Sequence, residues 1–141
     1  MGSGRQLTSA EWESIEPVLE ELSSRAGYRQ SLDRLKSRWR SFVGEVEIGY
    51  NDSADEYTND LSTRDLLQRV MDAAPAATCE KIRFMIARSD ARFEDATVSV
   101  ATPIRDRPGW WWGRIPKVLR GDLRQSFIDQ GVEVPSTQEP T

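Results

Sequence analysis

Two long amphipathic stretches joined by a short polar turn, together covering residues 32–73, constrain the fold of this chain more than any other feature. In the first stretch, large apolar side chains recur at steps of three and four residues: Leu32, Leu35, Trp39, Phe42, Val43 and Val46. This spacing places them along one face of an α-helix. Because the polar turn Gly49–Asp52 separates the two stretches, we expect them to fold back on each other as an αα-hairpin.

The second stretch opens with a helix-capping pattern. The Ser53 side chain is placed to accept a hydrogen bond from a backbone N–H of the first turn, and Glu56 can bond back to the Ser53 backbone. Apolar residues follow at a less regular spacing: Tyr57, Leu61, Leu67, Val70, Met71 and Ala74. The pattern predicts a helix over residues 53–73 whose weakest point is Ser62–Thr63, where a second cap is possible.

A capping box also predicts a helix near the N-terminus. Thr8 caps it and Glu11 closes the box three residues later. The apolar stripe that begins at Trp12 stops before Gly27, which ends the helix. Because the stripe runs unbroken through Pro17, we expect a kinked helix rather than two helices.

The same reasoning predicts the remaining helices and the fold class. The first helix of the hairpin is expected over residues 28–48, a fourth helix over residues 76–96 after Pro75, and a last one between residues 116 and 130. The predicted fold is all-α: a bundle of four main helices with an extended Trp-rich C-terminal arm and a short final helix.

The arm has a pattern of its own. Residues 98–100 alternate like a short strand without an evident partner, so we expect an extended segment packed across the helices. Farther along stand three consecutive tryptophans. In an extended backbone Trp110 and Trp112 point to one side and Trp111 to the other. One side can then cover the helical core while the other meets solvent or a partner.

Several interpretations of the arm stay open. Tryptophans beside arginines are typical of surfaces that bind single-stranded nucleic acid and of anchors at a membrane interface. Because each tryptophan can bury roughly 150–250 Å², we favour a lid that completes the core and leaves one tryptophan partly exposed. A basic patch on the outer face of the 28–48 helix offers either a nucleic-acid surface or partners for neighbouring acids: Arg29, Arg34, Lys36, Arg38 and Arg40.

Composition indicates one globular domain. Of the 141 residues, 38% are hydrophobic, and we expect residues 1–131 to form the domain and the polar tail 132–141 to be disordered. No apolar run approaches the roughly 18 residues that a membrane span needs. The first residues lack the apolar core of a signal peptide, so the expected location is the cytoplasm.

The absence of histidine excludes much enzyme chemistry. It removes histidine-based catalytic triads and HExxH zinc sites, and the single cysteine, Cys79, has no partner for an internal disulfide. The absence of histidine does not exclude a hydrolase that uses only carboxylates. Residues 51–56 superficially resemble a calcium loop but lack the glycine at its sixth position. We therefore predict a protein that is not an enzyme, with no cofactor and no tightly bound metal.

Negative charge is concentrated at the hairpin. Between Glu45 and Glu80, nine acids face only Arg64 and Arg69, a balance of −7 in a chain of net charge −4. Carboxylates gathered at a helix corner can dock a basic protein surface and speed its association. The simpler interpretation is a solvated turn. The predicted partner-binding residues are six acids and one tryptophan of the arm: Glu45, Glu47, Asp52, Asp55, Glu56, Asp60 and Trp111.

Three segments carry a family resemblance. They are WRSFVGEVEIGYNDSADEYTNDLSTRDLL from Trp39, DARFEDAT from Asp90 and GWWWGRIP from Gly109. Together they resemble a group of small, uncharacterised all-helical bacterial proteins with a Gly-Tyr/Tyr-Thr-Asn-Asp-Leu hairpin and a late Trp-rich arm. The resemblance covers residues 39–116 and implies no biochemical activity and no catalytic residue.

These features favour a non-catalytic protein-binding module. Small size, acidity, a helical scaffold and missing catalytic machinery compare most concretely with an immunity-type protein that neutralises a basic partner such as a toxin. The alternative is a nucleic-acid-associated regulatory protein that uses the basic helix face and the Trp/Arg arm.

Overall fold

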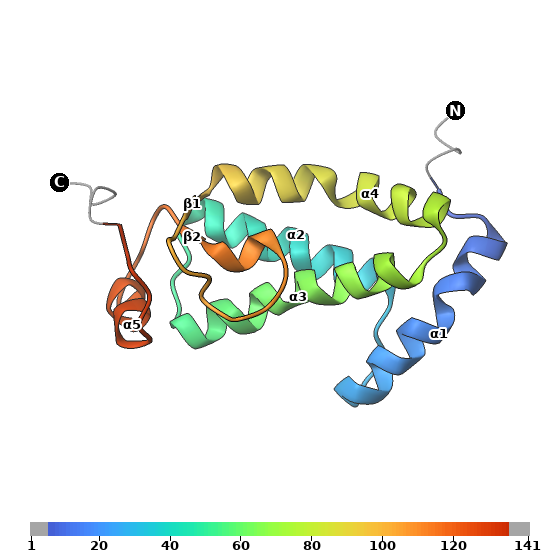
Figure 1. Ribbon diagram of the computed structural model, residues 1–141, viewed down its shortest axis with the longest axis horizontal. Helices are drawn as coiled ribbons and strands as arrows, with labels where there is room; N and C mark the ends of the chain where they lie inside the picture. Colours follow the sequence, from blue (N-terminus) through green and yellow to red (C-terminus); the bar gives the residue numbers. More distant parts are fainter. Residues whose placement is uncertain (1–5, 136–141) are drawn as a thin grey trace.

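Four long α-helices form the body of the protein in a computed structural model that describes residues 6–135. Their bounds are α1 (Ser9–Ala26), α2 (Leu32–Ile48), α3 (Ala54–Ala73) and α4 (Ala76–Asp95). Helices α2, α3 and α4 run side by side, α1 packs against one end of them, and the short α5 (Leu123–Asp129) lies at the other (Figure 1). The predicted all-α bundle of four main helices with a short final helix is confirmed.

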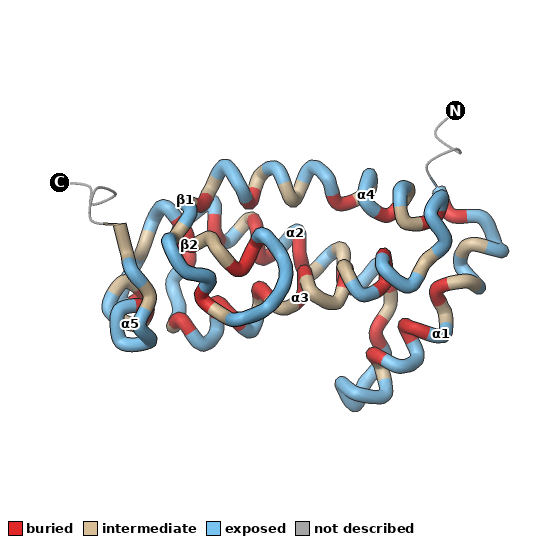
Figure 2. The backbone as a smooth tube through the Cα atoms, in the orientation of Figure 1, coloured by how far each residue is buried: buried red, intermediate tan, exposed pale blue. Residues whose placement is uncertain are grey.

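The core lies between α2, α3 and α4, where the buried positions of each helix face inward (Figure 2). At its centre the Phe42 ring lies 5.7 Å from Trp39, 5.5 Å from Tyr57 and 6.0 Å from Phe93. Each of these aromatic residues comes from a stripe that the sequence spacing predicted, because three- and four-residue steps align side chains on one helix face.

An ion pair ties the three central helices together. The Arg64 guanidinium of α3 contacts the Asp90 carboxylate of α4 at 2.9 Å, and only 5% of the Arg64 side chain is exposed. The Trp39 indole of α2 donates to the same carboxylate at 2.9 Å. Removing one partner of such a group is costly, because it leaves a charge buried without compensation.

The beginning of α1 agrees with the predicted capping box. The Glu11 backbone N–H donates to the Thr8 hydroxyl, and the Thr8 backbone N–H donates to the Glu11 carboxylate at 2.8 Å. The helix is continuous through Pro17 and ends at Gly27, whose positive φ of 82° suits glycine. Trp12, placed on the apolar stripe by its spacing, is 40% exposed instead.

Two predictions about the hairpin need correction. Helix α2 begins at Leu32 rather than at residue 28, because the Ser31 hydroxyl caps it by accepting the Arg34 backbone N–H. Ser53 caps α3 as predicted, but its own backbone N–H donates to Asp52 instead of Glu56. The weak point expected at Ser62–Thr63 does not interrupt α3.

The arm is less extended than predicted. Its strand β1 (Thr97–Ser99) does have a partner, the antiparallel strand β2 (Arg114–Pro116), with Val98 opposite Ile115. The tryptophans occupy a 3₁₀ turn, η2 (Trp110–Gly113), so they do not alternate sides as in a strand. Within residues 6–135 no helix combines the length and the apolar character that crossing a membrane requires.

Candidate functional site

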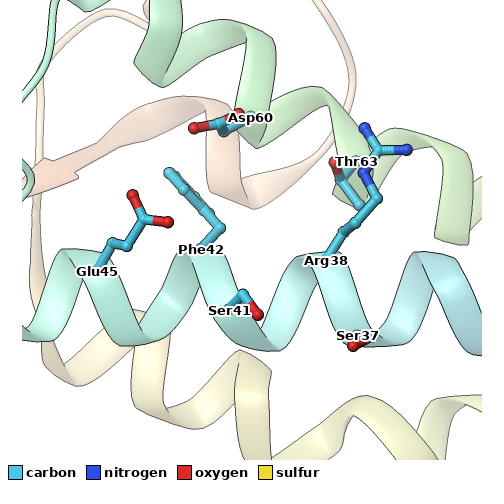
Figure 3. A pocket seen from close by; sticks show the side chains of 7 residues that line it. All are labelled: Ser37, Arg38, Ser41, Phe42, Glu45, Asp60 and Thr63. Atoms are coloured by element: carbon cyan, nitrogen blue, oxygen red, sulfur yellow. The ribbon is translucent and has the colours of Figure 1, made fainter.

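A cavity of about 240 Å³ opens between α2 and α3 beside the acidic corner. The spacing of three to four residues along α2 directs one row of side chains into it, and α3 supplies the opposite wall. Figure 3 shows the side chains that line it: Ser37, Arg38, Ser41, Phe42, Glu45, Asp60 and Thr63.

Glu45 and Asp60 line one end of this cavity, and Asp52 lies close enough to interact electrostatically with Glu45. Partial burial raises the pKa of Glu45, and the nearby charges of Asp60 and Asp52 raise it further. None of the ion pairs between described residues includes any of these three acids. The cluster therefore carries negative charge that the described part of the chain does not pair.

Tyr50 fixes the position of Asp60 within this cluster. Its hydroxyl donates to the Asp60 carboxylate at 2.7 Å, and its ring packs against Phe42 and Tyr57 at 5.6 and 5.4 Å. Burial, followed by the hydrogen bond to Asp60, raises the pKa of Tyr50 well above its ordinary value, so the hydroxyl remains a donor. The polar turn Gly49–Asp52 thus contains a buried aromatic side chain.

Arg38 lies at the other end of the cavity. In Figure 3 its guanidinium extends toward Thr63 of α3, whereas Glu45 and Asp60 lie beside Phe42. One guanidinium nitrogen, Nη1, is buried without a hydrogen-bond partner within residues 6–135. The cavity therefore has a cationic end and an anionic end, separated by two turns of α2.

The remaining predicted acids do not share this face. Glu47 projects from α2 to α4, where its carboxylate accepts from Arg92 at 2.9 Å, and this contact lowers the pKa of Glu47. Asp55 accepts from the Gln130 side chain at 2.7 Å. Glu56 is exposed at the first turn of α3. The six predicted acids, close in sequence, thus lie on different surfaces. Among them, Glu45 interacts electrostatically with Asp52 and Asp60.

Trp111, predicted to contact a partner, lies inside the molecule. It is 3% exposed and Trp112 is 1% exposed, whereas Trp110 is 41% exposed. The indole N–H groups of Trp111 and Trp112 both donate to the Asp65 carboxylate, at 2.9 and 2.8 Å. This arrangement agrees with the lid interpretation, because two rings complete the core and their polar atoms are satisfied.

The basic residues predicted to form a patch on the 28–48 helix make separate contacts instead. Arg29 pairs with Glu16 of α1 at 3.3 Å, and Lys36 pairs with Asp33 at 3.5 Å. Arg34 donates to the Arg29 carbonyl, while Arg38 lines the cavity. The patch and the tryptophans of the arm therefore do not combine into one surface of stacked rings and cations.

Sequence reasoning missed Tyr50 and Asp65, the two residues that organise these regions. An aromatic side chain inside a polar turn was the available signal for Tyr50. Asp65 offered none, because the indoles that it binds lie 46 and 47 residues later in the chain.

Within the described range 6–135, no three or more histidine, cysteine, aspartate or glutamate side chains are arranged so that they could hold a metal ion. Comparisons of the chain with protein-family models, with curated proteins and with solved structures found no match.

Proposed function

We propose that this chain is a non-catalytic protein-binding module whose α2–α3 cavity accepts a basic side chain of a partner protein. The observation that supports the proposal is the unpaired group of carboxylates at Glu45, Asp52 and Asp60. Burial, and after it repulsion from Asp60 and Asp52, raises the pKa of Glu45, and a cation placed among the three carboxylates would relieve the repulsion. Binding energy would then come from negative charge that forms no ion pair within residues 6–135.

The dimensions of the cavity favour a side chain as its occupant. About 240 Å³ is less than the roughly 300–1,000 Å³ usual for small-molecule pockets. Phe42 supplies an apolar surface for the stem of an arginine or lysine, whose charged end would reach the carboxylates. Small acidic immunity-type proteins that neutralise a basic toxin are the nearest functional comparison, made on size, charge and scaffold alone.

A basic peptide tests this proposal directly. We expect tetra-arginine to bind the full chain and tetra-citrulline, which has the same shape without charge, to bind much more weakly. Glu45→Gln and Asp60→Asn should each reduce tetra-arginine affinity, and about 0.5 M salt should weaken binding because it screens exposed charges. Asp60→Asn keeps an oxygen that can accept from Tyr50, so the fold should be retained.

Glu13→Gln is the matched control, because it removes the same charge from an exposed site on α1. Fluorescence anisotropy of labelled peptides would measure the peptide affinity of the parent protein and of the three variants. If tetra-citrulline bound as well as tetra-arginine, or if the control weakened binding as much as Glu45→Gln, the acidic cavity would not be the site.

A further inference from the structure

Two larger pockets lie on another side of α3. One, of about 630 Å³, lies beside α1, the other, of about 610 Å³, lies beside the arm, and Arg69 and Asp72 line both. Arg69 follows Asp60 by nine residues, which at 100° per residue places it on the opposite side of α3. The pocket that faces residues 107–111, called here the arm groove, is therefore separate from the acidic cavity.

An aromatic wall of the arm groove is held in position before any ligand binds. The Trp110 ring, 41% exposed, lies nearly perpendicular to Trp111 at 5.7 Å and 6.0 Å from Phe93. Gly109 adopts a positive φ of 126°, and a Cβ there would lie 2.6 Å from the Trp111 ring. Only glycine permits this close approach, so the backbone itself fixes the tryptophans.

The charges around the arm groove are paired except at one position. The Asp65 carboxylate accepts hydrogen bonds from both buried indole N–H groups and pairs with the Arg107 guanidinium. Arg69 pairs with Glu21 at 3.2 Å. Asp72 takes part in no ion pair between described residues and accepts one hydrogen bond, from Gln68 at 2.9 Å. The groove thus presents an aromatic wall together with one carboxylate that has no cationic partner in residues 6–135.

Gln68 holds that carboxylate in a fixed relation to the wall. Its amide oxygen accepts from the buried Arg64 at 3.0 Å, while its amide nitrogen donates to Asp72. Arg64 in turn lies 4.3 Å from the centre of the Trp111 ring. These contacts connect the aromatic wall to Asp72 through Arg64 and Gln68. The second carboxylate oxygen of Asp72 remains available to a ligand.

We propose that the arm groove binds a small aromatic amine, a ring carrying a protonated ammonium group. The ring would pack against Trp110 and Leu66, and the ammonium would pair with Asp72. A volume of about 610 Å³ lies within the range usual for small-molecule pockets, roughly 300–1,000 Å³. This site goes beyond the proposed partner-binding function, because it uses a different face and a different ligand.

Phenethylamine is the probe, and 3-phenylpropionate is its control, with a similar ring and chain but a negative charge. NMR spectra of the ¹⁵N-labelled full chain would follow the Trp110 indole N–H and the Asp72 backbone amide. We expect phenethylamine to shift both signals with low-millimolar affinity, typical of so small a ligand. The acid should bind about threefold more weakly or worse, because its charge repels Asp72.

Two variants separate the ring contact from the charge. Asp72→Asn should lower phenethylamine affinity about threefold while leaving 3-phenylpropionate no weaker than before. Trp110→Leu should weaken both ligands. Both residues are exposed, so circular dichroism and melting temperature should remain close to those of the parent.

Glu13→Gln again controls for charge and should change nothing. Equal affinity for the amine and the acid, or unaltered amine binding in Asp72→Asn or Trp110→Leu, would overturn the proposal. Signal shifts confined to Glu45 and Asp60 would also overturn it, since they would place the amine in the acidic cavity and support the proposed function instead.

Discussion

Replacing Asp65 by alanine tests how the arm is attached to the helical bundle. The carboxylate accepts two indole N–H groups, from Trp111 at 2.9 Å and Trp112 at 2.8 Å, and one contact from Arg107 at 3.2 Å. A buried donor left without its acceptor costs about 1–3 kcal/mol. Because the Asp65 side chain is 23% exposed, water can replace part of the loss, and we expect Asp65→Ala to lower the free energy of unfolding by about 2–4 kcal/mol.

Two companion variants isolate the cause. Arg107→Ala removes the ion pair of a side chain that is 54% exposed, so it should cost less than about 1 kcal/mol. Asp65→Asn keeps an oxygen that can accept from the indoles, so its loss in free energy of unfolding should lie between those of Asp65→Ala and Arg107→Ala. The free energy of unfolding of all three variants can be measured by urea denaturation, monitored by circular dichroism and tryptophan fluorescence. A loss below about 1 kcal/mol in Asp65→Ala, with an unchanged fluorescence spectrum, would refute the reasoning.

Three further predictions concern the core, pH and metals. Leu35→Ala and Leu67→Ala, both at fully buried positions, should each cost about 2–5 kcal/mol in denaturant unfolding; losses below about 1 kcal/mol at both would contradict the core assignment. Because the folded state raises the pKa of Glu45, the stability linked to this group is present at acidic pH and lost as pH rises through the raised pKa. Glu45→Gln should therefore stabilise the protein slightly at pH 7, by less than about 0.5 kcal/mol for so exposed a group, and not below about pH 4; an equal gain at both pH values would be inconsistent with this linkage. Chelator treatment should leave the melting temperature unchanged, and elemental analysis should find no stoichiometric zinc or iron; a stoichiometric metal would overturn this prediction.

Local patterns predicted most of the secondary structure. The caps at Thr8 and Ser53 depend on side chains within three residues of the backbone groups that they bind, so sequence order alone reveals them. The apolar stripes behave in the same way, because the helical period converts spacing into a face. At Trp12 this reasoning failed, because spacing assigns a side chain to a helix face but does not determine how much of that face is covered, and Trp12 is 40% exposed.

The candidate site was only partly predictable. Glu45, Asp52 and Asp60 were recognised as acids of one corner, yet Glu47, two residues from Glu45, belongs to another surface. Alternate positions on a helix are separated by about 200° around its axis, so closeness in sequence does not imply a shared face. Which acids meet was decided by the packing of α2 against both α3 and α4.

The sequence by itself determined the main helices, the hydroxyl caps at Thr8 and Ser53 and the concentration of negative charge at the hairpin, because each depends on residues within a turn or two of one another. Only the tertiary structure decided that the arm curls into a 3₁₀ turn, that β1 pairs with β2, and that Asp65 binds two distant indoles. Those contacts join segments far apart in the chain. Their stability comes from burying rings and satisfying polar groups together, which no local pattern encodes.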